Sequence, residues 1–404
     1  MTTSAELNFL PWDAFMQQHE AAWLRLWASM GAAPDLSPIW ARSLIHGHQL
    51  DTAELLVGFI TDACGEMTLV WPMRFTTHRR MGMTWRKVGA LTNIFCLHGG
   101  LLTSLDLGDA VRLTLQGLRG AQGAWSWLDV DLLETGSPLH TAWLRAAPQA
   151  DCRVERITKG RSPYIVSPGT LDEFLATKSR NFRSNMRARR RDVTTSPDVE
   201  VRYFTQPHEM DAYFALALAV ERKSWKRRTG TSLATREWET RLYEELLGRY
   251  ARIGQVRAAV LLIDGVPTAH SMDVLQGDRV YGLKTSFDPD FTVRRPGVML
   301  LVARLERYFA QGVREFDFIG MDEDYKLQWS RLCRSHESLR LYAPTLAARA
   351  LFLSTDLRRQ WRDYRSRSTP GVPVAGPAAP SVPGEGRPVL ARAALDGDQM
   401  SAST

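Results

Sequence analysis

The segment TVRRPGVMLLVARLERYFAQG (residues 292–312) predicts one amphipathic helix with a defined beginning and end. Pro296 stands near the first helical position, where its missing backbone N–H is not needed, and Gly312 stands just past the end. The apolar residues between them follow the three- and four-residue spacing of a single helix face: Val298, Leu301, Val302, Leu305, Tyr308 and Phe309. The neighbouring segments can be interpreted outward from this helix.

The sequence on both sides of the helix predicts strands of one sheet. Upstream, residues 252–291 contain three β-rich runs separated by Asp264-Gly265 and by Gln276-Gly277-Asp278, which are typical of hairpin turns. Downstream, REFDFIG (residues 314–320) predicts a short strand that returns to the same sheet. Because strand–helix–strand crossovers within one sheet are almost always right-handed and parallel, one strand pairing changes its sense beside the start of the helix.

The turn before the helix is a candidate binding site for phosphate groups. A helix N-terminus has backbone N–H groups without partners and the positive end of the helix dipole. Arg294 and Arg295 add positive charge, and Gly297 allows a ligand to approach the backbone closely. A surface turn with solvated arginines is the alternative interpretation, and both remain open at this point.

The first 155 residues predict a mixed arrangement of helices and a small sheet. A helical opening contains Trp12, Trp23, Trp27 and Trp40. Strand-like runs follow at residues 54–63, 65–75 and 125–133. The expected fold class is therefore α+β, with a mixed α/β sheet.

A strongly basic stretch, SRNFRSNMRARRRDV, occupies residues 179–193. Together with Lys178 it contributes a net charge of +6 to the formal net charge of +7 of the chain, so the basicity is local rather than spread over a face as in proteins that wrap nucleic acid. As a helix, the stretch places Phe182, Met186 and Val193 on one side. We interpret it as an amphipathic helix docked on the protein. Its arginines could attract an acidic acceptor, coenzyme phosphates or a tRNA, or could simply be solvated.

Composition limits the possible classes of protein. A chain of 404 residues that is 44% hydrophobic can form two domains of ordinary size. The N-terminus lacks a basic segment followed by an apolar run, and no stretch approaches the length of a membrane span, so we expect a cytoplasmic protein without a membrane span. The cysteines form no C-x-x-C pair, which favours reduced thiols over a disulfide framework or a metal site: Cys64, Cys96, Cys152 and Cys333.

The C-terminal end of the sequence predicts a helix followed by a tail. Residues 346–366 read as a closing helix. Residues 367–404 are rich in Pro, Ala, Gly and Ser, and contain few large apolar groups that could offset the entropy of ordering them. We expect this tail to be disordered and to lie outside the fold.

The arrangement around residues 292–312 resembles the core of the GNAT superfamily of acyl-CoA N-acyltransferases. The loop of that family is usually Q/R-x-x-G-x-G/A, which Arg294 and Gly297 match, whereas Met299 stands where a small residue is usual. The resemblance implies that the loop and the helix start hold the coenzyme A pyrophosphate, with the pantetheine arm between two parted strands. The implied cofactor-binding residues are Arg294, Arg295, Gly297 and Val298, and the implied co-substrate is acetyl-CoA or another acyl-CoA.

Other segments are similar, in order and spacing, to bacterial tandem-GNAT proteins related to the FemAB peptidyltransferases. This group includes acetyltransferases associated with the biosynthesis of cellulose and other exopolysaccharides. The similar segments span about residues 10–345 and are LVWPMRF (69–75), GSPLHTAWL (136–144), SRNFRSNMRARRRDV (179–193), ERKSWKRRTGTS (221–232) and FDFIGMDEDYKLQW (316–329).

This resemblance implies two GNAT-like domains in tandem. The first, residues 1–158, is expected to be degenerate, and the second, residues 159–345, is expected to be active. RRMGMTW (residues 79–85) faintly echoes the later loop, but no long apolar helix follows it in the sequence. We therefore interpret RRMGMTW as a turn that connects two strands.

Three residues are candidates for the base that acyl transfer to an amine requires. Glu221 shares a helical stripe with Phe214, Leu218 and Trp225, so it is either a general base or a boundary residue with an ion-pair partner. His270 lies early in a predicted central strand and is either a base or a hydrogen-bonded core residue. Asp317 faces away from the phenylalanines beside it and needs a partner if it is buried, for which Lys326 or an arginine would serve.

The remaining candidates concern the leaving thiolate and the acceptor. Tyr325 and Lys326 open a predicted short helix, with Trp329 one turn from Lys326. Tyr325 could protonate the thiolate and Lys326 could hold an acidic substrate, or both could be packing residues. Trp225, Arg183 and Arg187 are further candidates for substrate binding.

The sequence favours an acyl-CoA-dependent N-acyltransferase that acts directly on an amino group of a sugar, amino acid or similar small metabolite. The resemblance adds exopolysaccharide or cell-envelope biosynthesis as a setting. One alternative is an aminoacyl-tRNA-dependent, FemAB-like peptidyltransferase, although no long heptad pattern predicts the paired-helix arm common in those enzymes. Another is a non-catalytic scaffold for polysaccharide assembly, which Met299 favours.

Overall fold

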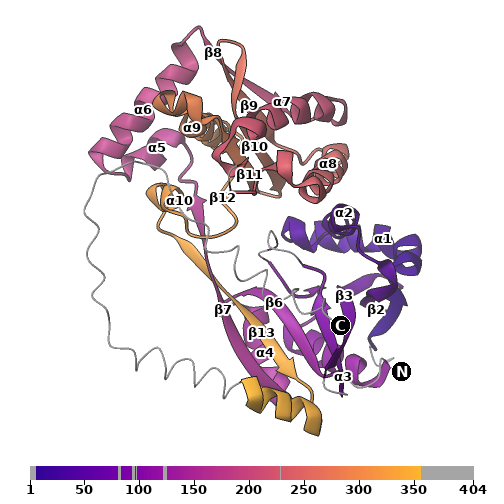
Figure 1. The fold of residues 1–404 in the computed structure, drawn as a ribbon. Helices are drawn as coiled ribbons and strands as arrows, with labels where there is room; N and C mark the ends of the chain where they lie inside the picture. Colours follow the sequence, from indigo (N-terminus) through magenta and orange to yellow (C-terminus); the bar gives the residue numbers. More distant parts are fainter. Residues whose placement is uncertain are drawn as a thin grey trace.

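The computed structural model describes residues 6–80, 83–92, 96, 98–121, 125–227 and 229–355. The described chain has two halves, each built from a sheet covered by helices. Figure 1 shows the two halves one above the other, with two long strands running between them.

The N-terminal half opens with a short strand and two Trp-rich helices, and continues with strands and crossover helices. Its strands are β1 (Asn8–Pro11), β2 (Leu55–Thr61), β3 (Met67–Arg80), β4 (Met83–Ala90), β5 (Leu102–Thr103), β6 (Trp127–Glu134) and β7 (Arg153–Val166). Its helices are α1 (Trp12–Ser29), α2 (Pro38–His48), α3 (Leu107–Ala121) and α4 (Pro138–Gln149), with 3₁₀ turns η1 (Pro34–Leu36) and η2 (Thr52–Glu54).

The C-terminal half begins with two helices that have no counterpart in the first half and then repeats the pattern. Its strands are β8 (Val199–Phe204), β9 (Ala258–Ile263), β10 (Val266–Gln276), β11 (Arg279–Phe287), β12 (Glu315–Asp317) and β13 (Cys333–Tyr342). Its α-helices are α5 (Leu171–Ala176), α6 (Arg180–Thr195), α7 (Met210–Lys223), α8 (Glu237–Arg252), α9 (Pro296–Ala310) and α10 (Asp324–Trp329). Its 3₁₀ turns are η3 (Pro207–Glu209), η4 (Trp225–Arg227), η5 (Leu233–Thr235) and η6 (Pro289–Arg294).

The two halves share one topology. Each runs through a strand, two helices, three antiparallel strands, a crossover helix, a parallel strand, a further helix and a long final strand. The crossover helix is α3 in the first half, where β4 pairs with β6 in parallel, and α9 in the second, where β11 pairs with β12 in parallel. The tandem arrangement expected from the sequence is therefore visible in the order and sense of the strands.

The halves exchange their final strands. The last strand of the C-terminal half, β13, pairs with β6 of the N-terminal half, while the last strand of the N-terminal half, β7, pairs with β12 through Tyr164–Val166. Strands β7 and β13 also pair with each other in antiparallel sense over most of their length. One sheet therefore runs through both halves, and the expected division after residue 158 falls inside β7.

The meander, crossover helix and return strand predicted around residues 252–320 are confirmed. Strands β9, β10 and β11 are antiparallel, and β12 is parallel to β11. One face of α9 is buried against this sheet because its apolar stripe, which includes Leu301, Val302 and Leu305, packs with Val280 of β11 and Phe316 of β12.

One expectation for the N-terminal half was wrong. RRMGMTW does lie at the β3–β4 hairpin, where Arg79 pairs with Thr84, while residues 81–82 lie outside the described part of the chain. However, a long crossover helix, α3, does follow further along. The helix is difficult to recognise in the sequence because its apolar residues, such as Val111 and Leu115, are interleaved with Arg, Gln and Gly and form only one buried face.

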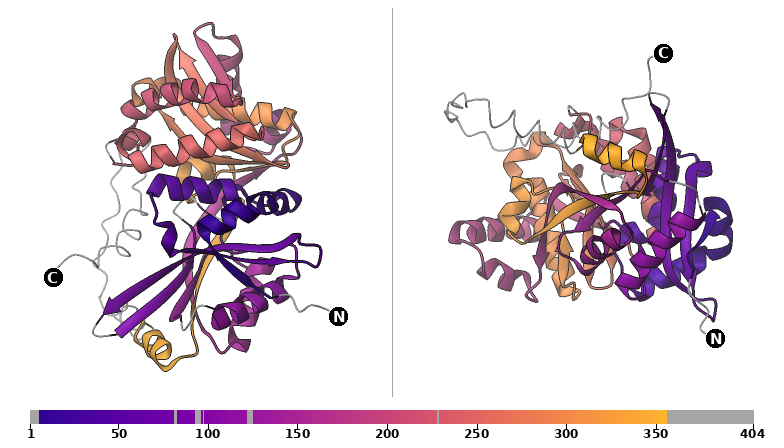
Figure 2. Two further views of the ribbon diagram at one scale, coloured as in Figure 1. Left: turned by 90° about the vertical axis from the view of Figure 1, so that its right-hand side faces the viewer. Right: turned by 90° about the horizontal axis from the view of Figure 1, so that it is seen from below.

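A single hydrophobic core joins the halves. Helices α1 and α2 lie between the N-terminal sheet and the C-terminal half (Figure 2, left), and their apolar residues pack with those of α7 and α8. Helix α2 approaches α8 closely at Gly47, where an added Cβ would lie 2.6 Å from the Cβ of Leu242. The Ser37 hydroxyl also lies 2.8 Å from the hydroxyl of Tyr250, which is fully buried. This contact joins the start of α2 to α8.

The chain returns to the N-terminal half at its C-terminal end. Residues 346–355 are helical, and Ala348 is buried in the core of the N-terminal half. The rest of the closing helix expected at residues 346–366, and the whole of the expected tail at residues 367–404, lie outside the described residues.

Candidate active site

Strands β11 and β12 part beside the start of α9. Their pairing ends at Tyr281 and Asp317, although β11 continues as far as Phe287. The stretch Gly282–Thr285 is partly exposed, whereas Thr268–Val274 of the neighbouring β10 are fully buried. A central strand of a wide sheet is normally covered on both sides, so this exposure marks the edge of β11 that β12 leaves partly uncovered. We call this partly uncovered edge, Gly282–Thr285, the groove.

A β-bulge lies in the same part of β11. Met272 of β10 pairs with Lys284, and the next residue of β10, Asp273, pairs with Gly282, so Leu283 is an extra residue in the ladder. Bulges bend a strand and interrupt its ladder. In the groove, the carbonyl of Leu283 accepts a hydrogen bond from Tyr243 (3.4 Å), and that of Thr285 accepts one from Lys226 (2.5 Å). Side chains from the α7–α8 region thus satisfy backbone oxygens of β11.

The start of α9 closes one end of the groove. Arg295, at the N-cap position, has a left-handed backbone (φ +53°) and makes no side-chain cap. A Cβ on Gly297 would lie 3.3 Å from the ring of Phe287, so a larger residue would press on β11. Met299 is fully buried against β9 and β10 rather than in the loop. The residue that departs from the expected loop pattern therefore faces the core and leaves the loop surface free.

The two arginines of this loop differ in their surroundings. Arg294 forms an ion pair with Asp198 (2.9 Å), and its carbonyl accepts a hydrogen bond from Arg189 of α6 (3.3 Å). Arg295 is exposed. Arg294 is thus tied to the connection between α6 and β8, and Arg295 remains available to a ligand.

Two of the predicted bases, Glu221 and His270, lie in contact. His270 Nε2 is 3.1 Å from Glu221 Oε1, its Nδ1 is 3.1 Å from the hydroxyl of Tyr213, and neither Glu221 nor His270 is exposed to solvent. Burial lowers the pKa of His270, and the nearby Lys226 and Lys284 act in the same direction. Burial would raise the pKa of Glu221, but the hydrogen bond from His270 and the two lysines hold it well below its usual range. The pair is thus an internal hydrogen-bonded unit.

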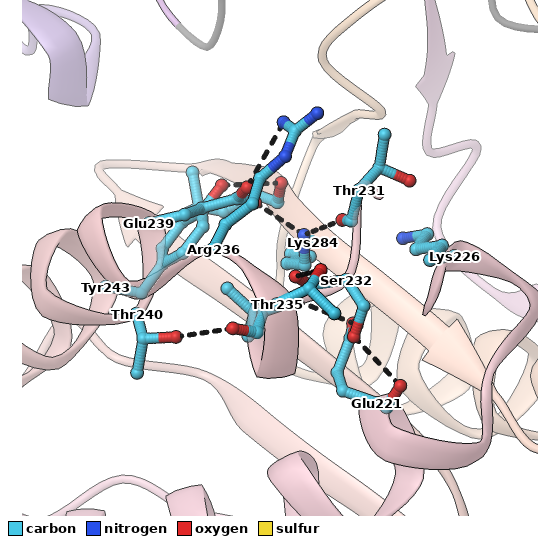
Figure 3. Close-up of polar contacts among 12 residues, drawn as sticks. Glu221, Lys226, Thr231, Ser232, Thr235, Arg236, Glu239, Thr240, Tyr243 and Lys284 are labelled. Carbon is cyan, nitrogen blue, oxygen red and sulfur yellow. Dashed lines mark hydrogen bonds and ion pairs between the residues drawn. The ribbon is translucent and has the colours of Figure 1, made fainter. Parts of the chain in front are cut away.

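Charged groups that the sequence interpretation did not single out lie near Glu221 (Figure 3). Lys284 of β11 forms an ion pair with Glu239 of α8 (2.5 Å) and donates to the carbonyl of Thr231 (3.3 Å). Arg236 lies 3.5 Å from the second carboxylate oxygen of Glu239, which is buried without a hydrogen-bond partner. Glu221 accepts a hydrogen bond from the backbone N–H of Leu233 (3.1 Å). A lysine within the apolar run of a central strand was the signal that could have identified Lys284.

Lys226 lies at the edge of the groove. Its side chain is partly exposed, and its Nζ bonds the carbonyl of Thr285. Among the described residues, no acidic side chain forms an ion pair with Lys226. Desolvation of the ammonium lowers its pKa to about 8, and the Lys284 ammonium contributes.

Asp317 and Lys326 occupy structural positions. Asp317 is buried and accepts hydrogen bonds from Arg334 (3.1 Å), the Ser162 hydroxyl (3.2 Å) and the Ile319 N–H (2.8 Å), so the arginine partner expected as one possibility is Arg334. Lys326 is also buried, and its Nζ donates to the carbonyls of Ile319 (2.7 Å) and Met321 (3.1 Å). Both residues thus hold the chain after β12 in place.

Tyr325 remains at the surface of α10, with 43% of the residue exposed. Desolvation of its hydroxyl and the neighbouring Glu323 carboxylate raise its pKa. A phenol is protonated at neutral pH even at its ordinary pKa of about 10, and the raised pKa makes Tyr325 a weaker proton donor.

The other candidates for substrate binding lie apart from one another. Trp225 belongs to η4, next to Lys226, and is partly exposed. Arg183 and Arg187 lie on α6, which docks through the buried Met186 as the sequence predicted. They line a shallow surface depression together with Asp172, Arg180, Ser184, Arg190, Arg191, Thr194 and Glu306.

Two classes of site find no support in the described residues. Within that part of the chain, no group of three or more His, Cys, Asp or Glu side chains is arranged to hold a metal ion. None of the described helices is long and apolar enough to cross a membrane.

Comparison with known proteins agrees with this geometry. Residues 180–327 match the family model described as an acetyltransferase (GNAT) domain. The structure is similar to that of FemX, with 13% identity and a TM-score of 0.54, over 81% of this chain and 96% of that chain. It is also similar to the C-terminal domain of a candidate lysylphosphatidylglycerol synthetase from Agrobacterium fabrum, with 12% identity and a TM-score of 0.50, over 84% of this chain and 96% of that chain.

A tandem GNAT protein from the clavulanic acid biosynthesis pathway matches with 13% identity and a TM-score of 0.42, over 84% of this chain and 99% of that chain. No curated protein sequence matched the chain.

A meander, a crossover helix and a parallel strand that parts from its neighbour define the class of fold as that of the N-acyltransferases. Residues 180–327 of the C-terminal half match a GNAT acetyltransferase domain. The whole chain has a GNAT/FemAB-like fold, as its sequence predicted.

Proposed function

We propose that this protein is an acyl-CoA-dependent N-acyltransferase, with acetyl-CoA as the acyl donor. The observation that carries the proposal is the parting of β11 and β12 after Tyr281, next to the start of α9. The partly exposed edge at Gly282–Thr285 can pair with the amide groups of an extended pantetheine arm, much as a further strand would.

The pyrophosphate of the coenzyme would lie at the start of α9. Arg295 is exposed there, and Gly297 brings the backbone of the first helical turn close to the surface. Arg294 would contribute its charge while sharing Asp198, and Val298 would line the loop. The absence of a side-chain cap on α9 supports an anion at this position.

The reaction would be a direct attack of an amine on the thioester carbonyl, without a covalent enzyme intermediate. The groove would align the two reactants, which supplies much of the rate enhancement in such reactions. Tyr325, a phenol at the surface of α10, would donate a proton to the departing thiolate.

The acceptor would be an amino group of a sugar, an amino acid or a similar small metabolite, in exopolysaccharide or cell-envelope biosynthesis, and the enzyme would act in the cytoplasm. No metal ion would be needed. The charged groups between α7, α8 and β11 would face the acceptor rather than the coenzyme.

Calorimetric titration with acetyl-CoA tests the proposal. We expect micromolar binding, and a loss of at least about tenfold in affinity for the double variant Arg294→Ala plus Arg295→Ala, equivalent to about 1.4 kcal/mol. Arg314→Ala is the matched control because Arg314 is highly exposed and pairs with Asp278 at the other end of α9. Absence of acetyl-CoA binding by the folded wild-type protein would refute the proposal.

A second candidate is aminoacyl-tRNA-dependent transfer, which the basic helix α6 favours. Four of its arginines form no ion pair with an acidic side chain within the described part of the chain: Arg180, Arg183, Arg187 and Arg191. Helix α6 packs on α9, so this row begins near the proposed phosphate site. Salt-sensitive binding of tRNA without binding of acetyl-CoA would favour this candidate. Met299 was the residue that favoured the third alternative, a non-catalytic scaffold. Because Met299 packs in the core, it no longer favours this alternative.

A further inference from the structure

The three residues that the sequence marked as bases are poorly placed to meet an incoming amine. Glu221 and His270 are fully buried and contact each other. Asp317 is 1% exposed and is held by Arg334. A base must come within hydrogen-bond reach of the proton that it removes. If the acceptor enters the groove from solvent, another group has to fill this role.

Lys226 is the titratable group that meets this requirement. It stands in η4, over the part of β11 from which β12 has parted, and its Nζ bonds the carbonyl of Thr285. Its partly exposed side chain borders the partly exposed stretch Gly282–Thr285. A thioester bound along this edge would place its carbonyl carbon near the Nζ. An amine that attacks this carbon would then lie near the Nζ as well.

Charged groups from every neighbouring element face Lys226. Lys284 on β11 repels its ammonium form, whereas Glu221 on α7, Glu239 on α8 and Glu323 in the connection from β12 to α10 attract it. His270 on β10 lies close enough to be influenced by both lysines. Desolvation outweighs the three carboxylates and lowers the pKa of Lys226 to about 8, so about a tenth of the side chain is a free amine at pH 7 and about half at pH 8.

We propose that Lys226 is the general base of this acyltransferase and removes the proton from the acceptor ammonium in the groove. The inference rests on the proposed function. The Nζ lone pair takes the proton, the acceptor nitrogen forms a C–N bond with the thioester carbon, and the C–S bond breaks. The departing thiolate takes up the proton of Tyr325, and the Tyr325 phenolate receives the second proton that the acceptor nitrogen loses as the amide forms. Lys226 returns its proton to solvent.

Kinetics of Lys226→Arg test the assignment. Arginine keeps the positive charge and can still donate to the Thr285 carbonyl, but it does not lose its proton near neutral pH. We expect kcat/KM to fall by about 100-fold, because general bases contribute about 10²–10⁴. We also expect acetyl-CoA affinity to stay within about threefold of the wild type, since the change is remote from the phosphate site. Lys223→Arg, at the exposed end of α7, is the matched control.

The pH profile separates a base from a merely structural lysine. For the wild type we expect kcat/KM to rise with pH through about 8, because only the neutral amine accepts a proton. This limb should be absent in Lys226→Arg, and added small primary amines should partly restore the activity of Lys226→Gly. Wild-type kcat/KM and an unchanged limb in a folded Lys226→Arg protein would overturn the inference.

A chemical measurement keeps the inference separate from the proposed function. Competitive labelling of the full-length protein with acetic anhydride across a pH series, read by mass spectrometry, reports the titration of each lysine. Lys226 should titrate near pH 8, below the ordinary lysine pKa of about 10.4. An ordinary titration would refute the inference even if acetyl-CoA binds. Failure to bind acetyl-CoA, with Lys226 titrating near pH 8, would instead refute the proposed function and the reaction built on it.

Discussion

The N-terminal half contains a counterpart of the C-terminal groove, and its own chain fills it. There the parallel pairing of β4 with β6 ends at Gly89 and Asp129, and Gly99, which follows β4 in the chain, lies against β6. The N–H of Gly99 donates to the carbonyl of Leu132 (3.1 Å), and a Cβ on Gly99 would lie 1.5 Å from the carbonyl oxygen of Asp131. In the C-terminal half, β12 ends at Asp317, and the stretch Gly282–Thr285 of β11 beyond the parallel pairing is partly exposed.

The starts of the two crossover helices differ in charge as well. The carboxylate of Asp106 accepts hydrogen bonds from the N–H groups of Gly108 (2.9 Å) and Asp109 (3.1 Å), and so fills the anion position at the start of α3. Helix α9 begins with Arg294 and Arg295 and has no side-chain cap. One topology thus gives one closed, acidic helix start and one open, basic helix start. The residues just before the helix and the path of one connection decide which half can bind an anionic ligand.

Gly99→Ala should have the largest effect on stability, because it alters the contact that fills the groove of the N-terminal half. The added methyl group would meet the Asp131 carbonyl at a distance that no real contact allows, so either the chain at Gly99, which we call the plug, or β6 must move. We expect the free energy of unfolding to fall by about 2–4 kcal/mol, measured by urea denaturation. Gly120→Ala is the matched control in α3, where nothing lies within 4 Å of the new Cβ and helix propensity favours alanine. Equal stability of the two variants would contradict this account of the plug.

Arg295→Asp would give α9 the acidic start of α3. We expect acetyl-CoA affinity to fall about 10- to 100-fold in calorimetric titration, equivalent to about 1.4–2.7 kcal/mol, because the carboxylate would occupy and repel the anion position. Arg295→Asn is the control because asparagine also tolerates the left-handed backbone of this residue but adds no charge. If both variants bind equally well, charge at the helix start does not distinguish the two halves.

Asp106→Ala tests the difference between the two helix starts in the N-terminal half, where the carboxylate caps α3. Loss of the two hydrogen bonds should cost about 1 kcal/mol of stability, read from the midpoint of urea unfolding. The variant should gain no second site for acetyl-CoA, since Gly99 still seals the N-terminal groove. A titration with two sites per chain would show that the helix cap alone had closed this half.

Lys226→Met should reveal the smallest effect, a dependence of stability on pH. The fold lowers the pKa of Lys226 from its ordinary value to about 8, so the charged form is disfavoured on folding and the penalty disappears as pH rises above 8. The stability of the variant relative to the wild type should therefore be higher at pH 7 than at pH 10. We expect a difference on the order of 1 kcal/mol in urea denaturation. A pH-independent difference would contradict the lowered pKa.

Local signals in the sequence were enough to predict the C-terminal core. Pro296, Gly312 and the apolar stripe between them bound α9, and hairpin turns separate β9, β10 and β11. The exchange of β7 and β13 could not be predicted in this way, because the pairing of His336 with Glu134 joins residues far apart in the chain and leaves no local pattern. The same holds for the plug at Gly99.

Prediction of the site was limited for a similar reason. Glu221 and His270 were identified by residue type and position, but their mutual contact depends on how α7 packs on β10. Lys226 and Glu239 gave no local signal, because each is one charged residue in a polar stretch of sequence. Their importance comes from burial and from distance to β11, which only the folded chain defines.

The exchanged strands have a mechanical consequence for ligand entry. A clamshell opening of the two halves about a flexible linker would have to tear the ladders between β6 and β13 and between β7 and β12. The shared core around α2 and α8 resists the same movement. The two halves are therefore held together by strand pairing as well as by a shared hydrophobic core, and they are not expected to part as two rigid bodies.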